Sequence, residues 1–320
     1  MRPDLTISLI NHSNPDLLRD CLRSLYATTM DISFEVFVVD NATGGRGVGE
    51  MRAEFPQVRW LFNSERLGFS ANHNQVLSQA QGRYACILND DMLAQEGALD
   101  TLVRFMDAHP AVGMAGARLL DPDGSPQNCA FRFLTPLSEL IGICFLPATC
   151  DGWKRLGVDA AQEADCPARV DWVLGACIVV RDRALQEIGL LDSDLSPIAN
   201  TEEVDWCLRA WKAGWEVAYC PAATLIHYGG QSMPPPASGA DRMRVEMLRT
   251  RIAYFRKHHG RAQALLVRAI YLATLPWNLF MLTQSRLRLR LPAAQYRSHL
   301  ATLTQVALMS LRPAIRYRHE

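Results

Sequence analysis

Residues 1–90 alternate between short apolar segments and segments with helical spacing, and this alternation constrains the fold more than any other feature of the chain. It predicts strands at 5–10, 34–39, 60–62 and 84–88, and helices at 15–25 and 71–80. Strands that alternate with helices are typical of a mainly parallel sheet covered by helices. We therefore expect an α/β fold with helices on both faces of the sheet.

Three of these strands end in polar residues, namely Asn11-His12, Asp40-Asn41 and Asn89-Asp90-Asp91. Adjacent carboxylates repel each other and lose hydration at a strand end, and a bound divalent cation removes that cost. Ligands of α/β proteins bind where the carboxyl ends of strands meet. The sequence therefore predicts a ligand site at this edge, and an ordinary strand-to-loop transition is the alternative.

The second half of the chain continues the alternation less regularly. It predicts helices at 99–106, 183–188 and 203–212, and strands at 112–119, 170–180, 217–219 and 224–226. Residues 125–168 contain several Pro, Gly and Cys residues, which predicts a loop-rich insert. Three consecutive prolines within 233–240 predict a linker, and residues 241–320 are helical in composition.

The formal net charge of zero hides a strong asymmetry along the chain. Residues 1–240 carry a net charge of −12, whereas residues 241–320 carry +12. This split predicts an acidic body and a basic tail that meets an anionic partner. Nucleic acid and an anionic membrane surface are the two candidates, and the acidic body argues against nucleic acid.

The basic tail contains 17 consecutive uncharged residues, 269–285, which include Trp277 and Phe280. A spanning helix needs about 20 apolar residues, and Pro276 and Asn278 interrupt this shorter run. An interfacial helix with flanking arginines is therefore expected. The alternative is a C-terminal helix that packs on the α/β domain.

The nine cysteines have irregular spacing, without a CxxC pair or a nearby His cluster, which argues against a zinc site. Their odd count and the lack of a signal peptide predict a reducing cytosol. We expect a cytoplasmic protein that is peripheral on the inner face of the plasma membrane.

Seven motifs recur in a familiar order: Ile10–Asn14, Val38–Thr43, Leu67–Phe69 with Asn74, Leu88–Asp91, Gly175-Ala176, Glu202–Asp205 and His227–Gly230. In this order they resemble a family 2 glycosyltransferase with the GT-A (nucleotide-diphospho-sugar transferase) fold, nearest to the rhamnosyltransferase-like members. The resemblance implies a catalytic domain over 1–232, with a donor half over 1–120 and an acceptor half over 121–232. A Pro-rich linker over 233–240 and a basic, amphipathic helical region over 241–320 would follow.

The resemblance implies that Mg²⁺ or Mn²⁺ stabilises the diphosphate that leaves the donor. It assigns the metal contact mainly to Asp91 and a further metal or diphosphate contact to His227, with Ser232 assisting the phosphate. Asn89 or Asp90 would face the ribose or the donor sugar. The alternative role of Asp90 is an N-cap of the following turn.

The donor-binding residues implied by the resemblance are Asn11, Asp40, Asn41, Arg66, Gly68, Asn74, Asn89 and Asp90. Asp40 would accept the N3–H of uracil or thymine, or else close an Asp-Asn turn. Gly68 would allow close approach of the backbone to the donor. Arg66 would pair with phosphate or remain a solvated loop arginine.

On the acceptor side, the resemblance makes Glu203 the base that deprotonates the attacking hydroxyl, at a position where the family has Asp. Asp205 is the alternative base, and its structural role would be a first-turn acid that complements the helix dipole. Trp206 and Trp172 would stack on an acceptor sugar or belong to the core.

The function implied is inverting, metal-dependent transfer of one sugar from dTDP-rhamnose or a UDP-sugar to a glycan or lipid-linked glycan, in cell-surface polysaccharide synthesis. The chain has no QxxRW motif and no series of spanning helices, which favours a single transfer over processive synthesis. The alternatives are a sugar nucleotidyltransferase and a non-catalytic nucleotide- or glycan-binding module. A nucleotidyltransferase is disfavoured because residues 10–15 contain no Gly and no Lys.

Overall fold

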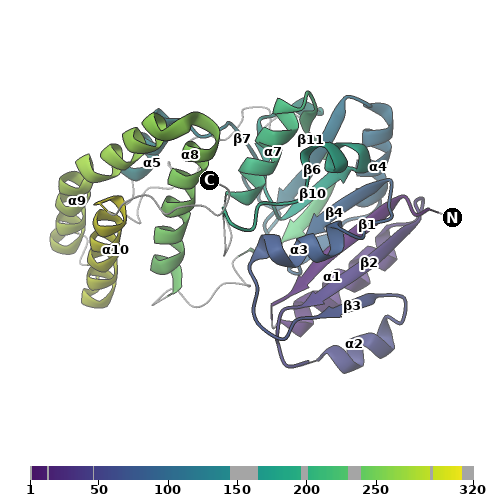
Figure 1. The fold of residues 1–320 in the computed structure, drawn as a ribbon. Helices are drawn as coiled ribbons and strands as arrows, with labels where there is room; N and C mark the ends of the chain where they lie inside the picture. The colour runs from purple at the N-terminus through teal and green to yellow at the C-terminus, as the bar shows by residue number, and fades with distance from the viewer. Residues whose placement is uncertain are drawn as a thin grey trace. The chain divides into compact units, whose positions relative to one another are not determined.

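A computed structural model of the chain is shown in Figure 1. It describes residues 2–12, 14–45, 47–144, 165–195, 201–229, 239–288 and 291–311. The chain forms two compact units, which are described separately. Unit 1 comprises Met1–Phe133, Val158–Ser193 and Pro197–Ser232, and unit 2 comprises Leu134–Gly157, Asp194–Ser196 and Met233–Glu320.

Unit 1 is built on a sheet whose described strands follow the order β3-β2-β1-β4-β10-β6-β11-β5, with β8 beside β11. The strands are β1 (Leu5–Asn11), β2 (Phe34–Asp40), β3 (Arg59–Phe62), β4 (Tyr84–Leu88), β5 (Met92–Ala94), β6 (Val112–Leu120), β8 (Ala168–Arg169), β10 (Cys177–Arg181) and β11 (Glu216–His227). A separate small sheet pairs β7 (Ala130–Phe131) with β9 (Trp172–Val173). The strands predicted in residues 1–90 are all present.

The sheet is mixed rather than mainly parallel. β3, β2, β1 and β4 are parallel to their neighbours, and β6 is parallel to β11. β10 lies antiparallel between β4 and β6. The direction of β10 follows from its entry point, because Ala176 just before it accepts a backbone hydrogen bond from Asn89 at the carboxyl end of β4 (2.9 Å).

Two strands predicted at 217–219 and 224–226 form the single strand β11. Its register against β6 shifts between Cys220 and Thr224. Pro221 lies in this interval and cannot donate to the ladder, which explains why the sequence pattern is interrupted while the strand continues.

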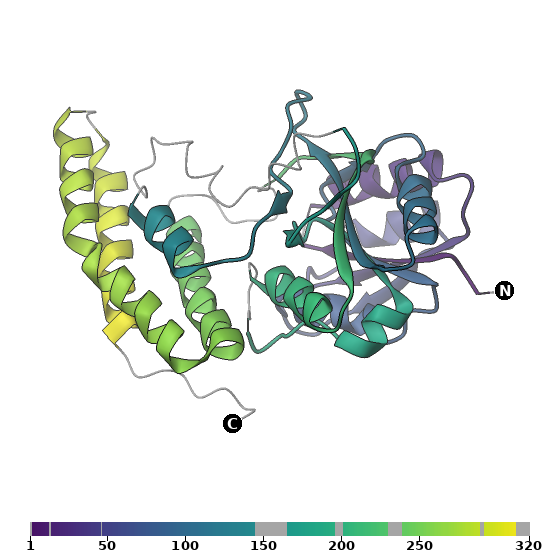
Figure 2. The ribbon, with the colours of Figure 1, turned by 90° about the horizontal axis from the view of Figure 1, so that it is seen from above.

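Helices cover both faces of the sheet (Figure 2). They are α1 (Pro15–Thr28), α2 (Val48–Glu54), α3 (Phe69–Leu77), α4 (Ala98–Ala108), α6 (Asp182–Ile188) and α7 (Glu202–Lys212). Alternate residues of β2 show why two layers form: Val36 and Val38 join the core cluster that contains α1, whereas Phe37 and Val39 pack on α3.

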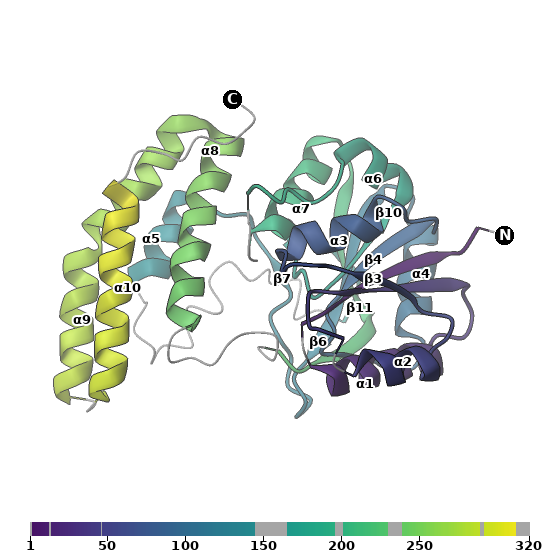
Figure 3. The same cartoon turned by 60° about the horizontal axis from the view of Figure 1, so that its bottom comes forward.

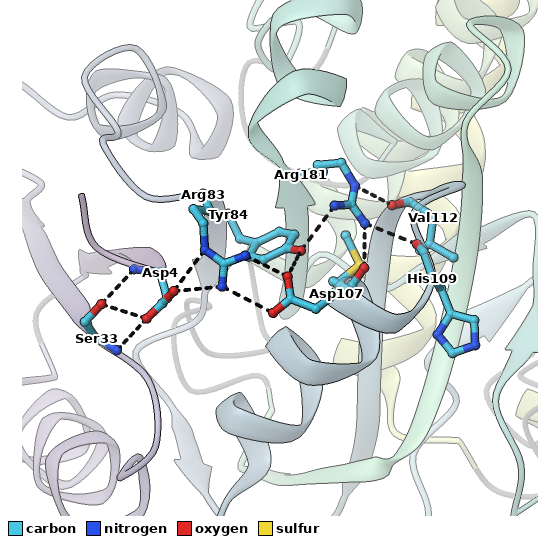
Figure 4. A network of polar contacts seen from close by, with 9 residues as sticks. Asp4, Ser33, Arg83, Tyr84, Asp107, His109, Val112 and Arg181 are labelled. Atoms are coloured by element: carbon cyan, nitrogen blue, oxygen red, sulfur yellow. Dashed lines mark hydrogen bonds and ion pairs between the residues drawn. The ribbon is translucent and has the colours of Figure 1, made fainter. Parts of the chain in front are cut away.

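The strand starts are joined by a polar network at one edge of the sheet (Figure 4). Arg83 at the start of β4 donates to Asp4 before β1 (2.7 Å) and to Asp107 of α4 (2.7 Å). Hydrogen bonds from Ser33, and then from Arg83, lower the pKa of Asp4 to about 2. This edge is therefore held by paired charges, and it lies opposite the edge where the strands end.

Unit 2 is helical and contains α5 (Pro136–Cys144), α8 (Gly239–Ala273), α9 (Leu275–Arg288) and α10 (Ala293–Leu311). The sequence missed α5, which falls in the predicted loop-rich insert. Its buried Glu139 accepts hydrogen bonds from Arg251 (3.0 Å) and from the Tyr271 hydroxyl, both on α8. Long-range contacts therefore stabilise a helix whose local sequence contains Pro136 and Gly142.

The helical run Arg242–Arg288 is the one candidate membrane span among the described residues by length and composition, with a mean hydropathy of 1.5 over its best window. This run is not one straight helix, because Gly260 adopts φ 84° and ψ 176° and breaks α8. Only 28% of the apolar window is buried in the protein.

Candidate active site

The carboxyl ends of β1, β2, β4, β6 and β11 meet at one edge of the sheet in unit 1 (Figure 3). This follows from the strand directions, because β10 is antiparallel to both β4 and β6 and so makes these two run the same way. The polar residues that follow the apolar strand segments are therefore gathered in one place. They include most of the residues predicted to bind a donor.

Asn11 and Asp40 end the adjacent strands β1 and β2 and are both buried. Asn11 Nδ2 donates to Asp40 Oδ1 (2.8 Å), and the Thr43 hydroxyl donates to the same oxygen. Both bonds orient the carboxylate and leave Oδ2 of Asp40 to accept from a ligand. This geometry suits recognition of a single N–H donor such as that of a pyrimidine base.

Asn89, Asp91 and His227 form the centre of the edge. His227 Nε2 lies 3.3 Å from Asp91 Oδ1 and 3.3 Å from Asn89 Nδ2. Asp91 is only 2% exposed, and its Oδ1 has no hydrogen-bond donor among the described residues. A buried carboxylate oxygen without a donor is costly unless another group compensates its charge.

Gln127 fixes which nitrogen of His227 carries the proton. Its Nε2 donates to Asp121 Oδ1 (2.7 Å) and to the His227 carbonyl oxygen (2.7 Å), so its Oε1 must face the ring. Oε1 lies 2.8 Å from His227 Nδ1 and can only accept, so Nδ1 is protonated. In the neutral ring, Nε2 then carries the lone pair, and it lies 3.3 Å from Asn89 Nδ2, which can donate to it, and 3.3 Å from Asp91 Oδ1.

These residues fit a divalent cation. A carboxylate oxygen and an imidazole lone pair face each other without a proton between them in the neutral ring, and a cation between them would satisfy both. No three His, Cys, Asp or Glu side chains in the described part of the chain form a complete cage. Mg²⁺ and Mn²⁺ commonly take few protein ligands and complete their coordination with substrate phosphates and water.

Asp90 contacts the residue that follows β1. Its Oδ2 accepts from the backbone N–H of His12 (3.3 Å). Arg66 approaches the His12 carbonyl oxygen at 3.5 Å, and burial together with Arg66 lowers the pKa of the His12 ring. Arg66 itself is exposed.

Two residues predicted to bind the donor, Asn41 and Asn74, form hydrogen bonds to the protein backbone. Asn41 makes reciprocal hydrogen bonds with the backbone of Leu67 (2.8 and 3.0 Å). Asn74 does the same with the backbone of Leu191 (2.8 and 3.0 Å). Both side chains thus shape loops beside the site. Gly68 precedes α3 in an extended conformation, with φ −74° and ψ 169°.

Glu203 and Asp205 begin α7 and have different surroundings. Glu203 Oε2 accepts from the backbone N–H of Thr201 (3.1 Å), and a side chain added at Gly175 would lie 3.7 Å from its Cβ. The next residue, Ala176, bonds to Asn89, so Glu203 lies near the centre of the edge. Asp205 is fully buried and accepts from Arg209 Nε (2.8 Å).

The two tryptophans also differ. Trp206 is fully buried, and its Nε1 donates to the Gly189 carbonyl oxygen (2.9 Å), so it belongs to the core and does not contact an acceptor. Trp172 stacks on Phe131 with ring centroids 4.2 Å apart and remains partly exposed. Ser232 lies outside the described residues.

Sequence reasoning missed Gln127, Asp121, Asn63 and Asn72. Asp121 begins an Asp-Pro-Asp-Gly segment that is typical of a turn, and Gln127 lies six residues later without any local signal. Asn63 donates to Asn72 (2.6 Å) and to Asn41 (3.3 Å), which extends the network that holds the loop before α3. These polar residues act through their neighbours, so their spacing carries no motif.

The sequence model of the family described as "Glycosyl transferase family 2" matches residues 6–131. A curated N-acetylglucosaminyl-diphospho-decaprenol L-rhamnosyltransferase of Mycobacterium tuberculosis is 26% identical over 244 residues, which cover 71% of this chain and 77% of that protein. An uncharacterized protein of Sinorhizobium fredii is 25% identical over 236 residues, and the match spans 72% of this chain but only 25% of that relative.

Two solved structures share the fold. A mannosyltransferase from Pyrobaculum calidifontis in complex with GDP-Man and Mn²⁺ has a TM-score of 0.55 and 17% identity, covering 97% of this chain and 88% of that one. GalNAc-T7 with UDP, GalNAc and Mn²⁺ has a TM-score of 0.53 and 14% identity, covering 78% of this chain and 47% of that one. At these identities the likeness concerns the fold alone.

Proposed function

This chain is a family 2 glycosyltransferase with the GT-A fold, and from that premise we propose that it transfers one sugar, with inversion, from a nucleoside-diphosphate sugar to a glycan or lipid-linked glycan. The observation that carries the proposal is the pairing of Asp91 Oδ1 with His227 Nε2 at 3.3 Å. A bound cation would compensate the charge of this buried oxygen, which has no hydrogen-bond donor among the described residues.

When bound between Asp91 and His227, Mg²⁺ or Mn²⁺ would offset the negative charge that builds on the departing diphosphate. Both similar structures contain Mn²⁺, which supports this choice of cofactor. Asn89 Nδ2 lies beside the pair and would donate to a donor oxygen. Arg66 on the rim would add a charge-assisted hydrogen bond to phosphate.

Asp40 would select the nucleotide through its free Oδ2, which can accept the N3–H of uracil or thymine. We therefore propose dTDP-rhamnose or a UDP-sugar as the donor. The mycobacterial relative supports the first of these by its name, which specifies L-rhamnosyl transfer to an N-acetylglucosaminyl-diphospho-decaprenol. A lipid-linked acceptor would place this chain in cell-envelope polysaccharide synthesis, on the cytoplasmic face of the membrane.

Glu203 is the proposed base. Thr201 N–H holds one carboxylate oxygen and so orients the group beside the Gly175 loop, where the acceptor hydroxyl would lose its proton as it attacks the anomeric carbon. Asp205 is less suited to this task, because it is fully buried and paired with Arg209. We propose that Asp205 holds the start of α7 in place.

The test is Asp91→Asn, with Asp16→Asn on the exposed first turn of α1 as the matched control. Thermal shifts of both variants are measured against nucleoside-diphosphate sugars with and without Mn²⁺. We expect Asp91→Asn to lose the Mn²⁺-dependent shift and to reduce sugar transfer by roughly 100-fold or more, while Asp16→Asn behaves like the parent. Full transfer activity in Asp91→Asn would overturn the proposal.

A further inference from the structure

Exposed large hydrophobic side chains are concentrated in unit 2. Of the fifteen such side chains in the described part of the chain, eleven belong to this unit, although it is the smaller one. Seven of them are on α9 and α10: Trp277, Leu279, Phe280, Leu287, Leu300, Leu308 and Leu311. Such a concentration of exposed large apolar side chains on two neighbouring helices is typical of an interaction site.

α9 has the reverse of the usual helix polarity. Its buried positions, at helical spacing, are Asn278, Leu282 and Ser285, and the preceding buried residue is Thr274. Its exposed positions include Phe280, which is 53% exposed, and Leu287, which is 70% exposed. A helix of a soluble protein buries its apolar stripe and exposes its polar one.

α10 repeats this pattern. Its buried positions are Thr302, Val306 and Ser310, at a spacing of four residues, whereas Leu308 and Leu311 are exposed. α9 and α10 lie side by side and pack on each other, as the views of Figure 2 and Figure 3 agree. The helix pair thus buries small polar residues together with Leu282 and Val306, and it exposes several large apolar residues.

Several interior polar groups form hydrogen bonds to the backbone of their own helix, whereas Asn278 Oδ1 and the Ser310 hydroxyl have no partner among the described residues. The Ser285 hydroxyl donates to the Met281 carbonyl oxygen (2.9 Å), and the Thr302 hydroxyl donates to that of Ser298 (3.1 Å). Asn278 Nδ2 donates to the Thr274 carbonyl oxygen (3.1 Å). Small residues between helices, with hydroxyls bonded four residues back, are the packing used by helices surrounded by lipid.

The charges of the α9–α10 hairpin indicate which kind of partner surface it suits. Residues 275–311 contain no Asp or Glu, whereas Arg286, Arg288 and Arg297 lie near the turn between the helices. At 1.5 Å per residue, α9 is about 21 Å long, which is shorter than the roughly 30 Å hydrocarbon core of a bilayer. The hairpin therefore suits the interface of an anionic bilayer better than a crossing.

Trp277 also favours a position at the interface of the bilayer. Its indole N–H donates to the Cys144 carbonyl oxygen of α5 (2.9 Å), and its ring lies 6.0 Å from that of Phe280. The polar end of this side chain is thus satisfied inside the protein while the ring remains exposed. Aromatic side chains of this kind are enriched where hydrocarbon meets headgroups.

We propose that the α9–α10 hairpin inserts its outer apolar face into the anionic surface of a lipid bilayer, with its arginines at the level of the headgroups. The inference adds to the basic-tail contact expected from the sequence, because apolar insertion and not charge alone would hold the protein there. It is independent of the proposed sugar transfer, since it concerns only unit 2.

The test is co-flotation of the full chain with vesicles of phosphatidylcholine, alone or mixed with phosphatidylglycerol. Phe280→Glu is compared with Phe62→Glu, because Phe62 on β3 of unit 1 is 54% exposed and provides a matched control. We expect Phe280→Glu to weaken binding to the mixed vesicles by roughly tenfold or more, since it removes one of the largest apolar groups of the face. Phe62→Glu should bind like the parent.

Each other outcome overturns the proposal. Equal binding by the parent and Phe280→Glu would mean that the apolar face does not insert. Binding that high salt abolishes completely would assign the attachment to the arginines alone. A concentration-dependent dimer that Phe280→Glu dissociates, with no vesicle binding by the parent, would assign the face to a second copy of the chain.

Discussion

Replacing Gln127 by Leu tests the arrangement of the site more directly than removing a metal ligand. In our proposal Gln127 contacts neither the nucleotide-sugar donor nor the sugar acceptor. Its Oε1 accepts a hydrogen bond from His227 Nδ1 (2.8 Å). Leu fills a similar volume and cannot accept. The ring is then free to place its proton on Nε2, where it would block the lone pair that faces Asp91.

The size of the effect can be worked out from the lost hydrogen bond. A buried donor left without an acceptor costs about 1–3 kcal/mol, and each 1.36 kcal/mol corresponds to a factor of ten. This range corresponds to roughly 5- to 150-fold, which agrees with the 10- to 100-fold loss typical of removing the outer partner of a metal-binding His. We therefore expect Mn²⁺ affinity to fall by about 10- to 100-fold.

The assay is a Mn²⁺ titration that is followed by electron paramagnetic resonance in the presence of UDP or dTDP. The matched control is Gln186→Leu, which removes an exposed Gln–Asp hydrogen bond (3.1 Å) on α6, away from the site. Sugar transfer should fall in parallel with Mn²⁺ affinity in Gln127→Leu and recover at high Mn²⁺. Unchanged Mn²⁺ affinity in a folded Gln127→Leu protein would refute the role assigned to this residue.

Two further predictions concern the acids. Glu203→Gln should retain the donor-dependent thermal shift and lose turnover by roughly 100-fold or more. Asp205→Asn should retain turnover and lower the melting temperature, because Arg209 loses its carboxylate partner. The opposite pattern would make Asp205 the base. Because the pKa of Asp4 is lowered from 3.8 to about 2, the folded state gains stability above pH 4 and loses it as pH falls toward 2. The shift corresponds to about 2 kcal/mol at most, and to about 1 kcal/mol after solvent screening. The free energy of unfolding in urea should therefore fall less steeply between pH 4 and pH 2 in Asp4→Asn than in the parent. An equal fall in both proteins would contradict this reading.

The strand ends of unit 1 could be predicted from the sequence because each apolar segment is followed at once by polar residues. Asp40 and Asp91 are found in this way, since local patterning alone identifies the edge on which they lie. His227 required the resemblance, because it is 136 residues from Asp91 along the chain and a single His carries no pattern. The structure brings the two side chains within 3.3 Å.

Other features could not be predicted because their causes are not local. The antiparallel direction of β10 depends on where Gly175-Ala176 meets the end of β4, and α5 depends on the partners of Glu139 in α8. Asn41 and Asn74 show a structural role that the sequence pattern does not reveal. Their residue type suits ligand binding, but the backbone groups of Leu67 and Leu191 already occupy both ends of each amide.

Carboxylates at the strand starts and Asp91 at the strand ends have opposite surroundings, and this contrast separates stability from function. At the strand starts, Asp4 and Asp107 are both paired with Arg83 (Figure 4). At the strand ends, Asp91 is buried with an oxygen that no described donor reaches. An uncompensated buried charge destabilises the fold, so a neutral isostere there should stabilise the protein. Asp91→Asn should therefore raise the melting temperature of the ligand-free protein while it abolishes the Mn²⁺-dependent shift, because the same unpaired oxygen is both the cost to the fold and the binding site of the cation.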